Sequence, residues 1–91
     1  MYTLVQTARY TQELDEIEAG AGHIEDRLRR GVYLTLQRRP SEGSKSEGTG
    51  IYIIRQRIIQ DLLIVQIYYR IHEEANEVHL LSMRVVNMLG M

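Results

Sequence analysis

The sequence has 91 residues, of which 44% are hydrophobic and 25% charged, and its formal net charge is −1. These values are typical of one small globular domain and argue against disorder of the whole chain. Cysteine is absent, which excludes disulfides and thiolate metal sites. No apolar run approaches the length of about 18 residues that predicts a membrane span. The first residues do not resemble a signal peptide, so we expect a cytoplasmic protein.

The first quarter of the chain predicts a strand followed by a helix. Residues 2–7 (YTLVQT) alternate loosely and are rich in residues that favour strands. Thr7 is suited to cap the helix that follows, because its hydroxyl can accept a hydrogen bond from the first helical turn. Apolar side chains then recur at helical spacing, at Tyr10, Leu14 and Ile17. The glycines in residues 20–22 end this helix, because glycine readily takes the left-handed conformation found there.

A second helix is predicted over residues 23–38. Its apolar face comprises Ile24, Leu28, Val32, Thr35 and Leu36. Gly31 lowers the stability of the helix by roughly 1 kcal/mol relative to alanine and leaves room for close approach to the first helix. Pro40 ends the segment, because the residue before a proline disfavours the helical conformation. Residues 40–50 hold three serines and three glycines without an apolar anchor, so they predict a flexible surface loop.

Charge is distributed unevenly along the chain. Residues 1–20 carry a net charge of −3, whereas residues 21–40 carry +3. The basic side chains of the second block predict either a solvated helix face or a surface that binds a partner or phosphate. The candidate partner-binding residues are Arg27, Arg30 and Arg38.

Three short apolar runs follow, at residues 51–59, 62–71 and 78–86. They are rich in β-branched and aromatic residues and too short for three helices, so they predict strands. The short turns at residues 60–61 and 73–76 join them into an antiparallel meander. In the middle strand, alternate residues form one apolar face that we expect to pack on the helices: Leu63, Val65, Ile67, Tyr69 and Ile71.

No short turn joins the first strand to a neighbour, so we expect it beside one edge of the meander, either parallel or antiparallel. The predicted element order is β-α-α-β-β-β. The predicted fold class is α+β, with a two-helix hairpin on one face of a four-stranded sheet. Residues 1–91 form a single domain.

No standard motif for phosphate binding, zinc binding or serine hydrolysis is present. His72 and His79 flank the second turn and could bind a metal together with Glu73 or Glu77. Histidines near a surface turn more often have no such role, so we predict no metal and no cofactor. Ser82 has no evident base at strand spacing, which disfavours a serine nucleophile.

The remaining constellation consists of arginines on the strands. Arg55 and Arg57 are two residues apart and therefore share a sheet face. Whether Arg70 and Arg84 join them depends on the register of the meander. If they converge, their guanidinium groups could grip RNA phosphates and stabilise a phosphoryl-transfer transition state, with a tyrosine stacking on a base. The alternative is that these arginines pair with acidic residues or remain solvated.

Two stretches resemble the RelE/ParE superfamily of toxins from bacterial toxin–antitoxin modules. YTLVQTARYTQELDEI (residues 2–17) is similar to the first strand and helix of that family. IVQIYYRIHEEANEVHLLSMRVV (residues 64–86) is similar to its last hairpin, in which an acidic turn separates two apolar strands. The predicted order of elements also matches over almost the full chain.

This resemblance implies a cytoplasmic toxin that a cognate antitoxin protein holds inactive. Many members cleave mRNA on the ribosome with basic residues and a tyrosine on the sheet face, whereas others inhibit DNA gyrase without cleaving anything. The resemblance implies catalytic roles for Tyr68, Arg70 and Arg84, and RNA binding by Arg55, Arg57 and Tyr69.

The sequence also departs from the RNA-cleaving members. Its isoelectric point is near 6.3, Lys45 is its single lysine, and the tail after residue 86 offers Asn87 but no histidine, arginine or tyrosine. Two alternatives therefore stay open. One is a non-catalytic toxin, attenuated or directed at gyrase, that acts by binding. The other is an unrelated α+β domain that forms a homodimer through an exposed strand, because an apolar strand such as 62–71 is a liability at a sheet edge.

Overall fold

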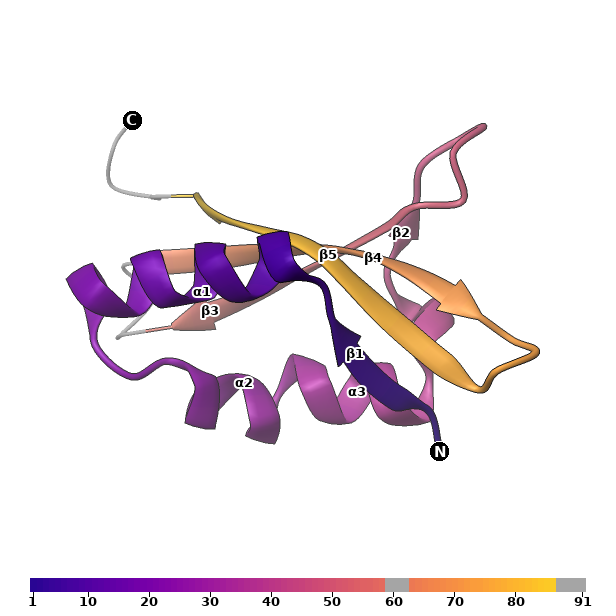
Figure 1. Ribbon diagram of the computed structural model, residues 1–91, viewed down its shortest axis with the longest axis horizontal. Coiled ribbons are helices and arrows are strands. Elements are labelled where there is room, and N and C mark those ends of the chain that lie inside the picture. The colour runs from indigo at the N-terminus through magenta and orange to yellow at the C-terminus, as the bar shows by residue number, and fades with distance from the viewer. Residues whose placement is uncertain (59–62, 87–91) are drawn as a thin grey trace.

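The computed structural model describes residues 1–58 and 63–86, which form helices packed on a twisted sheet (Figure 1). The elements in chain order are β1 (Thr3–Gln6), α1 (Ala8–Ala21), α2 (Glu25–Arg30), α3 (Val32–Arg38), the 3₁₀ helix η1 (Pro40–Glu42), β2 (Ser44–Lys45), β3 (Tyr52–Ile58), β4 (Leu63–His72) and β5 (Glu77–Val86). The predicted α+β class is confirmed. No helix in these two ranges is long and apolar enough to cross a membrane. The turn predicted at 60–61 and the tail after residue 86 lie outside the described residues.

The strands form one mixed sheet in the order β1-β5-β4-β3-β2. The predicted meander is confirmed, because β3, β4 and β5 pair antiparallel. The predicted turn between β4 and β5 is also confirmed, and Asn76 takes a positive φ of 56° there. β1 lies beside β5 and runs parallel to it. Since β4 is in the centre of the sheet, its apolar side chains need no dimer partner to protect an edge.

The ends of α1 follow from two residues. Thr7 has an extended backbone, and its hydroxyl oxygen accepts a hydrogen bond from the Tyr10 amide at 3.3 Å, as an N-cap does. Gly22 has a φ of 85°, and its amide donates to the Glu18 carbonyl at 2.9 Å. Both predicted helix boundaries are confirmed.

The prediction of one helix over residues 23–38 is wrong, because the helix breaks at Gly31 into α2 and α3. Gln56 of β3 inserts at this break. Its side-chain oxygen accepts a hydrogen bond from the Val32 amide at 2.8 Å, and its amide nitrogen donates to the Arg27 carbonyl at 3.1 Å. A Cβ atom on Gly31 would clash with the Gln56 side-chain oxygen. The close approach predicted at Gly31 therefore involves β3 and not the first helix.

The hydrophobic core lies between the helices and one face of the sheet. The apolar face predicted for the middle strand is confirmed, since Val65, Ile67 and Tyr69 are buried. The helices contribute Tyr10, Leu14, Ile24, Leu28, Val32, Tyr33 and Leu36 to the same cluster. The hydroxyls of Tyr10 and Tyr33 lie 2.7 Å apart and bond to each other, so neither buried oxygen lacks a partner. Burial raises the pKa of Tyr33 to about 12.

Residues 40–50 contain more regular structure than the sequence predicts. Pro40 is buried at the start of η1, and β2 pairs with β3 as a fifth strand. The hydroxyl of Tyr69 donates to the Pro40 carbonyl at 2.5 Å and accepts from the Gly43 amide at 3.2 Å. A Cβ atom on Gly43 would meet the Ile53 carbonyl at 2.8 Å, so glycine allows this close approach. The flexibility of the rest of the segment stays a prediction.

Candidate nucleic-acid interface on the open sheet face

The sheet has one face covered by helices and one open face. Along β4, Tyr69 is buried beneath the helices, so its neighbours Tyr68 and Arg70 point to the open face. Arg55 and Arg57 of β3 share the open face, because the side chain of the residue between them bonds to the helices. The predicted shared face of these arginines is therefore present in the structure.

A β-bulge in β5 turns Arg84 to the open face. The pairing of β5 with β4 shifts between Leu80 and Ser82 and leaves Leu81 as an extra residue. Leu80 and Met83 are both buried although they are three positions apart, which regular alternation does not allow. Without the extra residue, Arg84 would lie on the same side as Leu80 and point toward the core.

The register brings three of the four strand arginines close together. Gln66 of β4 is paired with Arg55 of β3 on one side and with Arg84 of β5 on the other. Arg57 lies two residues further along β3 and is therefore the next side chain after Arg55 on the same face. The open face therefore holds Arg55, Arg57 and Arg84 as one group.

Gln66 and Tyr68 fix the geometry of this group. Arg55 Nε donates to the side-chain oxygen of Gln66 at 2.6 Å, and the amide nitrogen of Gln66 donates to the Tyr68 hydroxyl at 2.5 Å. The Arg84 guanidinium carbon lies 6.0 Å from the centroid of the Tyr68 ring, within range of a cation–π contact. Among the described residues, no acidic side chain forms an ion pair with Arg55 or Arg84.

Two residues predicted for the site lie outside this group. Arg70 is on the open face but four residues from Gln66, about 13 Å along the strand, and it donates to the Thr49 carbonyl at 3.3 Å. Tyr69 is 0% exposed, and its hydroxyl holds residues of the 40–50 segment. The prediction that Tyr69 stacks on RNA is therefore wrong, because its ring has no accessible face; burial raises the pKa of its hydroxyl to about 12.

A cavity of about 340 Å³ opens beside Tyr68 on this face. Its lining residues are Arg9, Ile51, Tyr68, Leu81, Ser82 and Arg84. Arg9 belongs to α1 and was not among the predicted site residues. Its spacing of four from Glu13 indicates an ion pair on the helix surface. That spacing does not indicate which strand the helix packs on, so it could not place Arg9 at this cavity.

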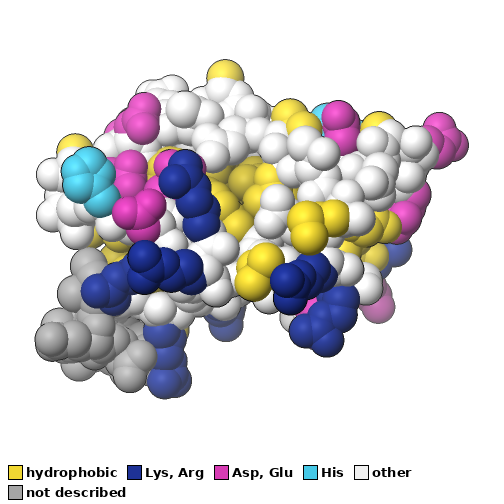
Figure 2. Space-filling view, turned by 90° about the horizontal axis from the view of Figure 1, so that it is seen from below, with side chains coloured by type: hydrophobic (Ala, Val, Ile, Leu, Met, Phe, Trp, Pro, Cys, Tyr) yellow, Lys and Arg dark blue, Asp and Glu magenta, His cyan; other side chains and the backbone are white. Residues whose placement is uncertain are grey.

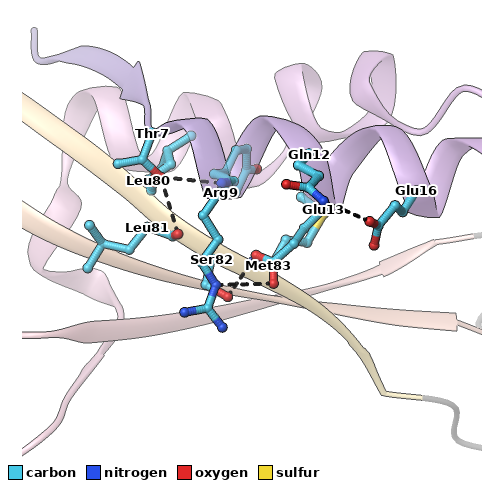
Figure 3. Close-up of polar contacts among 10 residues, drawn as sticks. Thr7, Arg9, Gln12, Glu13, Glu16, Leu80, Leu81, Ser82 and Met83 are labelled. Atoms are coloured by element: carbon cyan, nitrogen blue, oxygen red, sulfur yellow. Dashed lines mark hydrogen bonds and ion pairs between the residues drawn. The ribbon is translucent and has the colours of Figure 1, made fainter.

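Helix α1 reaches the cavity because it covers the edge of β5 beyond the end of β1 (Figure 3). The Thr7 hydroxyl donates to the Leu80 carbonyl at 2.9 Å. One carboxylate oxygen of Glu13 accepts from the Ser82 hydroxyl at 2.9 Å and from the Met83 amide at 3.0 Å. Partial burial acts to raise the pKa of Glu13, but these hydrogen bonds and the nearby Arg9 outweigh it, so the pKa is lowered.

The predicted partner-binding residues lie on the outer surface of α2 and α3. Arg27, Arg30 and Arg38 are exposed, and none of them forms an ion pair within the described part of the chain. Arg29 and Arg39 on the same surface pair with acidic neighbours three or four residues away. Figure 2 shows basic side chains gathered on this side of the molecule in two groups, with hydrophobic side chains between them.

His72 and His79 do approach each other, as the sequence suggested. Their ring centroids lie 3.9 Å apart in a stacked arrangement, and a nitrogen of His79 lies 2.9 Å from a Glu77 oxygen. Within residues 1–58 and 63–86, no three histidine or acidic side chains are grouped so as to hold a metal ion.

Fold and surface together define a small α+β protein whose sheet is covered by helices on one side and carries arginines and a tyrosine on the other. No protein-family model matches the sequence, and no curated protein matches it. Solved structures do match. A chain of the intact Escherichia coli RelBE toxin–antitoxin complex superposes with a TM-score of 0.67 at 20% identity, covering 91% of this chain and 94% of that one.

Two further structures agree with this result. The isolated E. coli RelE toxin has a TM-score of 0.64 at 19% identity, with coverage of 91% of this chain and 82% of that one. A metal-bound toxin from Helicobacter pylori has a TM-score of 0.54 at 11% identity, with coverage of 100% and 99%. The chain therefore has the fold of the RelE toxin, as the resemblance predicted, at a sequence identity of 19–20% to the RelE structures.

Proposed function

We propose that the chain is the toxin of a toxin–antitoxin module and acts on RNA in the cytoplasm. The observation that carries this proposal is the group of Arg55 and Arg84 around Tyr68, beside a cavity on the open sheet face. Arginine stays charged at any physiological pH and binds phosphate through two parallel hydrogen bonds. A tyrosine ring at the surface stacks on an unpaired base. Single-stranded RNA supplies both groups, and the shared fold with the RelE toxin supports the role of a toxin.

The proposed reaction is cleavage of mRNA bound to the ribosome. Arg84 and Arg55 would stabilise the negative charge that develops on phosphorus oxygens in the transition state. Tyr68 would hold the adjacent base, which fixes the reacting phosphate relative to the two guanidinium groups. Arg57 and Arg70 would bind the RNA backbone on either side of this point. In this proposal Arg70 is a backbone contact, because it lies too far from Arg84 to share one phosphate.

The proposed partner is a cognate antitoxin protein. One of the matching solved structures is a RelBE toxin–antitoxin complex. The surface of α2 and α3 suits an acidic segment of such a partner, because Arg27, Arg30 and Arg38 lack ion-pair partners among the described residues. Replacing these three arginines with glutamate should weaken capture of the protein encoded beside this chain, while Arg29→Glu should have a smaller effect.

A second candidate function is inhibition by binding without cleavage, for example of DNA gyrase. One observation favours it: the residues that line the cavity include no histidine or carboxylate that could move a proton during cleavage. Glu13, which lies nearby, already accepts hydrogen bonds from β5. A homodimer through an exposed strand stays a further prediction, although the outer strands β1 and β2 have only four and two residues.

The test is controlled induction of the chain in a bacterial host, with growth and mRNA ends followed together. We expect growth arrest with new mRNA ends, and we expect Arg84→Ala to lower cleavage about 100-fold. Arg70→Ala should have a smaller effect, and Arg29→Ala should leave cleavage unchanged. Arrest with intact mRNA would favour the second candidate, and the absence of arrest with folded protein would contradict both.

A further inference from the structure

Part of the wall of the cavity beside Tyr68 comes from helix α1 and not from the strands. Strand β4 contributes Tyr68 to the lining and β5 contributes Leu81, Ser82 and Arg84, whereas Arg9 comes from α1. Figure 3 shows the Arg9 side chain extending from α1 past Ser82. A volume of about 340 Å³ lies within the range of small-ligand pockets, roughly 300 to 1,000 Å³.

Glu13 contacts both β5 and the Arg9 side chain. One oxygen of its carboxylate holds α1 to β5 through the Ser82 hydroxyl and the Met83 amide. The other oxygen accepts from Arg9 Nε at 3.5 Å. The two terminal nitrogens of the Arg9 guanidinium make no hydrogen bond to any described residue, and the side chain is 68% exposed. They are thus available to an anion that enters the cavity.

We propose that Arg9 is a second phosphate-binding arm of the RNA site, facing the same cavity as Arg84, and that Glu13 positions it. This inference rests on the proposed RNA function. A base would stack on Tyr68 against the apolar side chains of Ile51 and Leu81. The phosphate next to that base would then receive donors from β5 through Arg84 and from α1 through Arg9. One nucleotide would then be bound by two elements, α1 and β5, that are far apart in the sequence.

The experiment measures binding of a fluorescent single-stranded RNA of about eight nucleotides, with 2′-O-methyl riboses that block attack by the 2′-hydroxyl. Affinity is determined over a range of salt concentrations for the unaltered chain and for Arg9→Ala. The matched control is Arg29→Ala. Arg29 also pairs with a glutamate four residues away, and the two pairs have nearly equal exposure, at 68% and 23% against 64% and 27%. Arg29 lies on α2, away from the cavity.

We expect Arg9→Ala to weaken binding about three- to tenfold at low salt. It should also reduce the slope of log affinity against log salt by about 0.7, the value for one lost contact to a single strand. Thermal unfolding should show that Arg9→Ala and Arg29→Ala are equally stable. If Arg84→Ala weakens binding while Arg9→Ala matches Arg29→Ala, the role of Arg9 is overturned and the proposed function stands. If the unaltered chain binds no RNA, this inference is overturned, whereas the proposed cleavage of ribosome-bound mRNA is decided separately by the induction experiment.

Discussion

Tyr68 and Tyr69 are consecutive residues of one strand, yet they face opposite sides of the sheet and have different roles. Tyr69 is fully buried, stacks on Tyr52 with ring centroids 5.5 Å apart, and bonds to backbone atoms of the 40–50 segment. Tyr68 is partly exposed beside a cavity, under an arginine. Tyrosine thus contributes to core packing on the covered face, whereas on the open face it presents an accessible ring.

The two faces also differ in how their polar groups are paired. Every buried side-chain nitrogen and oxygen among the described residues has a hydrogen-bond partner. Gln56 on the covered face uses both ends of its amide to close the gap between α2 and α3. On the open face, Arg57 and Arg84 form neither ion pairs nor side-chain hydrogen bonds with the described residues. The open face thus combines a bonded group, Arg55, Gln66 and Tyr68, with two arginines that have no such partner among the described residues.

The largest expected effect separates the two tyrosines. Tyr69→Ala removes a buried ring and its hydrogen bonds and should lower the free energy of unfolding by about 3–5 kcal/mol. Tyr68→Ala should lower it by about 1 kcal/mol or less, because its ring is already partly in water. Denaturant titration of both variants checks this difference. Equal losses would show that the open face contributes to the core as much as the covered face does.

Strand patterning in the sequence is sufficient to predict which face Tyr69 takes, because alternation along residues 63–71 is a local property. The short turns likewise predict the meander. The position of Arg84 could not be predicted in this way, because the extra residue Leu81 reverses the alternation in β5. Nothing in the local pattern distinguishes this bulge from a regular strand, so the convergence of Arg84 with Arg55 required the structure.

The other structural features that the sequence did not predict also depend on contacts between residues distant in the sequence. β1 pairs with β5 across more than seventy residues, and no turn encodes that choice. The break at Gly31 depends on Gln56, and the order in residues 40–43 depends on Tyr69. Arg9 lines the cavity because Thr7 and Glu13 hold α1 against β5. In each case the local amino-acid pattern predicts the helix or strand itself, but it does not predict which other element that helix or strand packs against.

A second prediction tests the polar contact on the covered face. Gly31→Ala places a Cβ atom in steric clash with the Gln56 side-chain oxygen and should lower the free energy of unfolding by about 1–3 kcal/mol. Gly20→Ala is the matched control, because Gly20 lies within α1 with no atom near a new Cβ, and alanine there should stabilise the chain by about 0.5–1 kcal/mol.

Combining Gly31→Ala with Gln56→Ala sharpens this test. Gln56→Ala alone leaves the Val32 amide and the Arg27 carbonyl without their partner. The double variant also removes the clash, so its loss of stability should be smaller than the sum of the two single losses. Additive losses would show that Gly31 acts through backbone conformation alone and not through its contact with Gln56.

The smallest expected effect concerns Glu13, which lies where the two faces meet. Its pKa is lowered in the folded chain, so its contribution to stability is fully present above the unfolded pKa of about 4.3 and is lost as the pH falls through the lower folded value. Glu13→Gln keeps the shape of the side chain but loses the charge, and should lower the free energy of unfolding by roughly 1 kcal/mol at neutral pH. The difference between the two chains should stay constant from pH 7 to about pH 5 and shrink in more acidic solution. Glu16→Gln alters an exposed carboxylate whose one side-chain partner among the described residues is Gln12, so it should change stability little at any pH. A difference for Glu13→Gln that grew as the pH fell would mean that its carboxyl is held in the protonated form, and the attachment of α1 to β5 would then need another explanation.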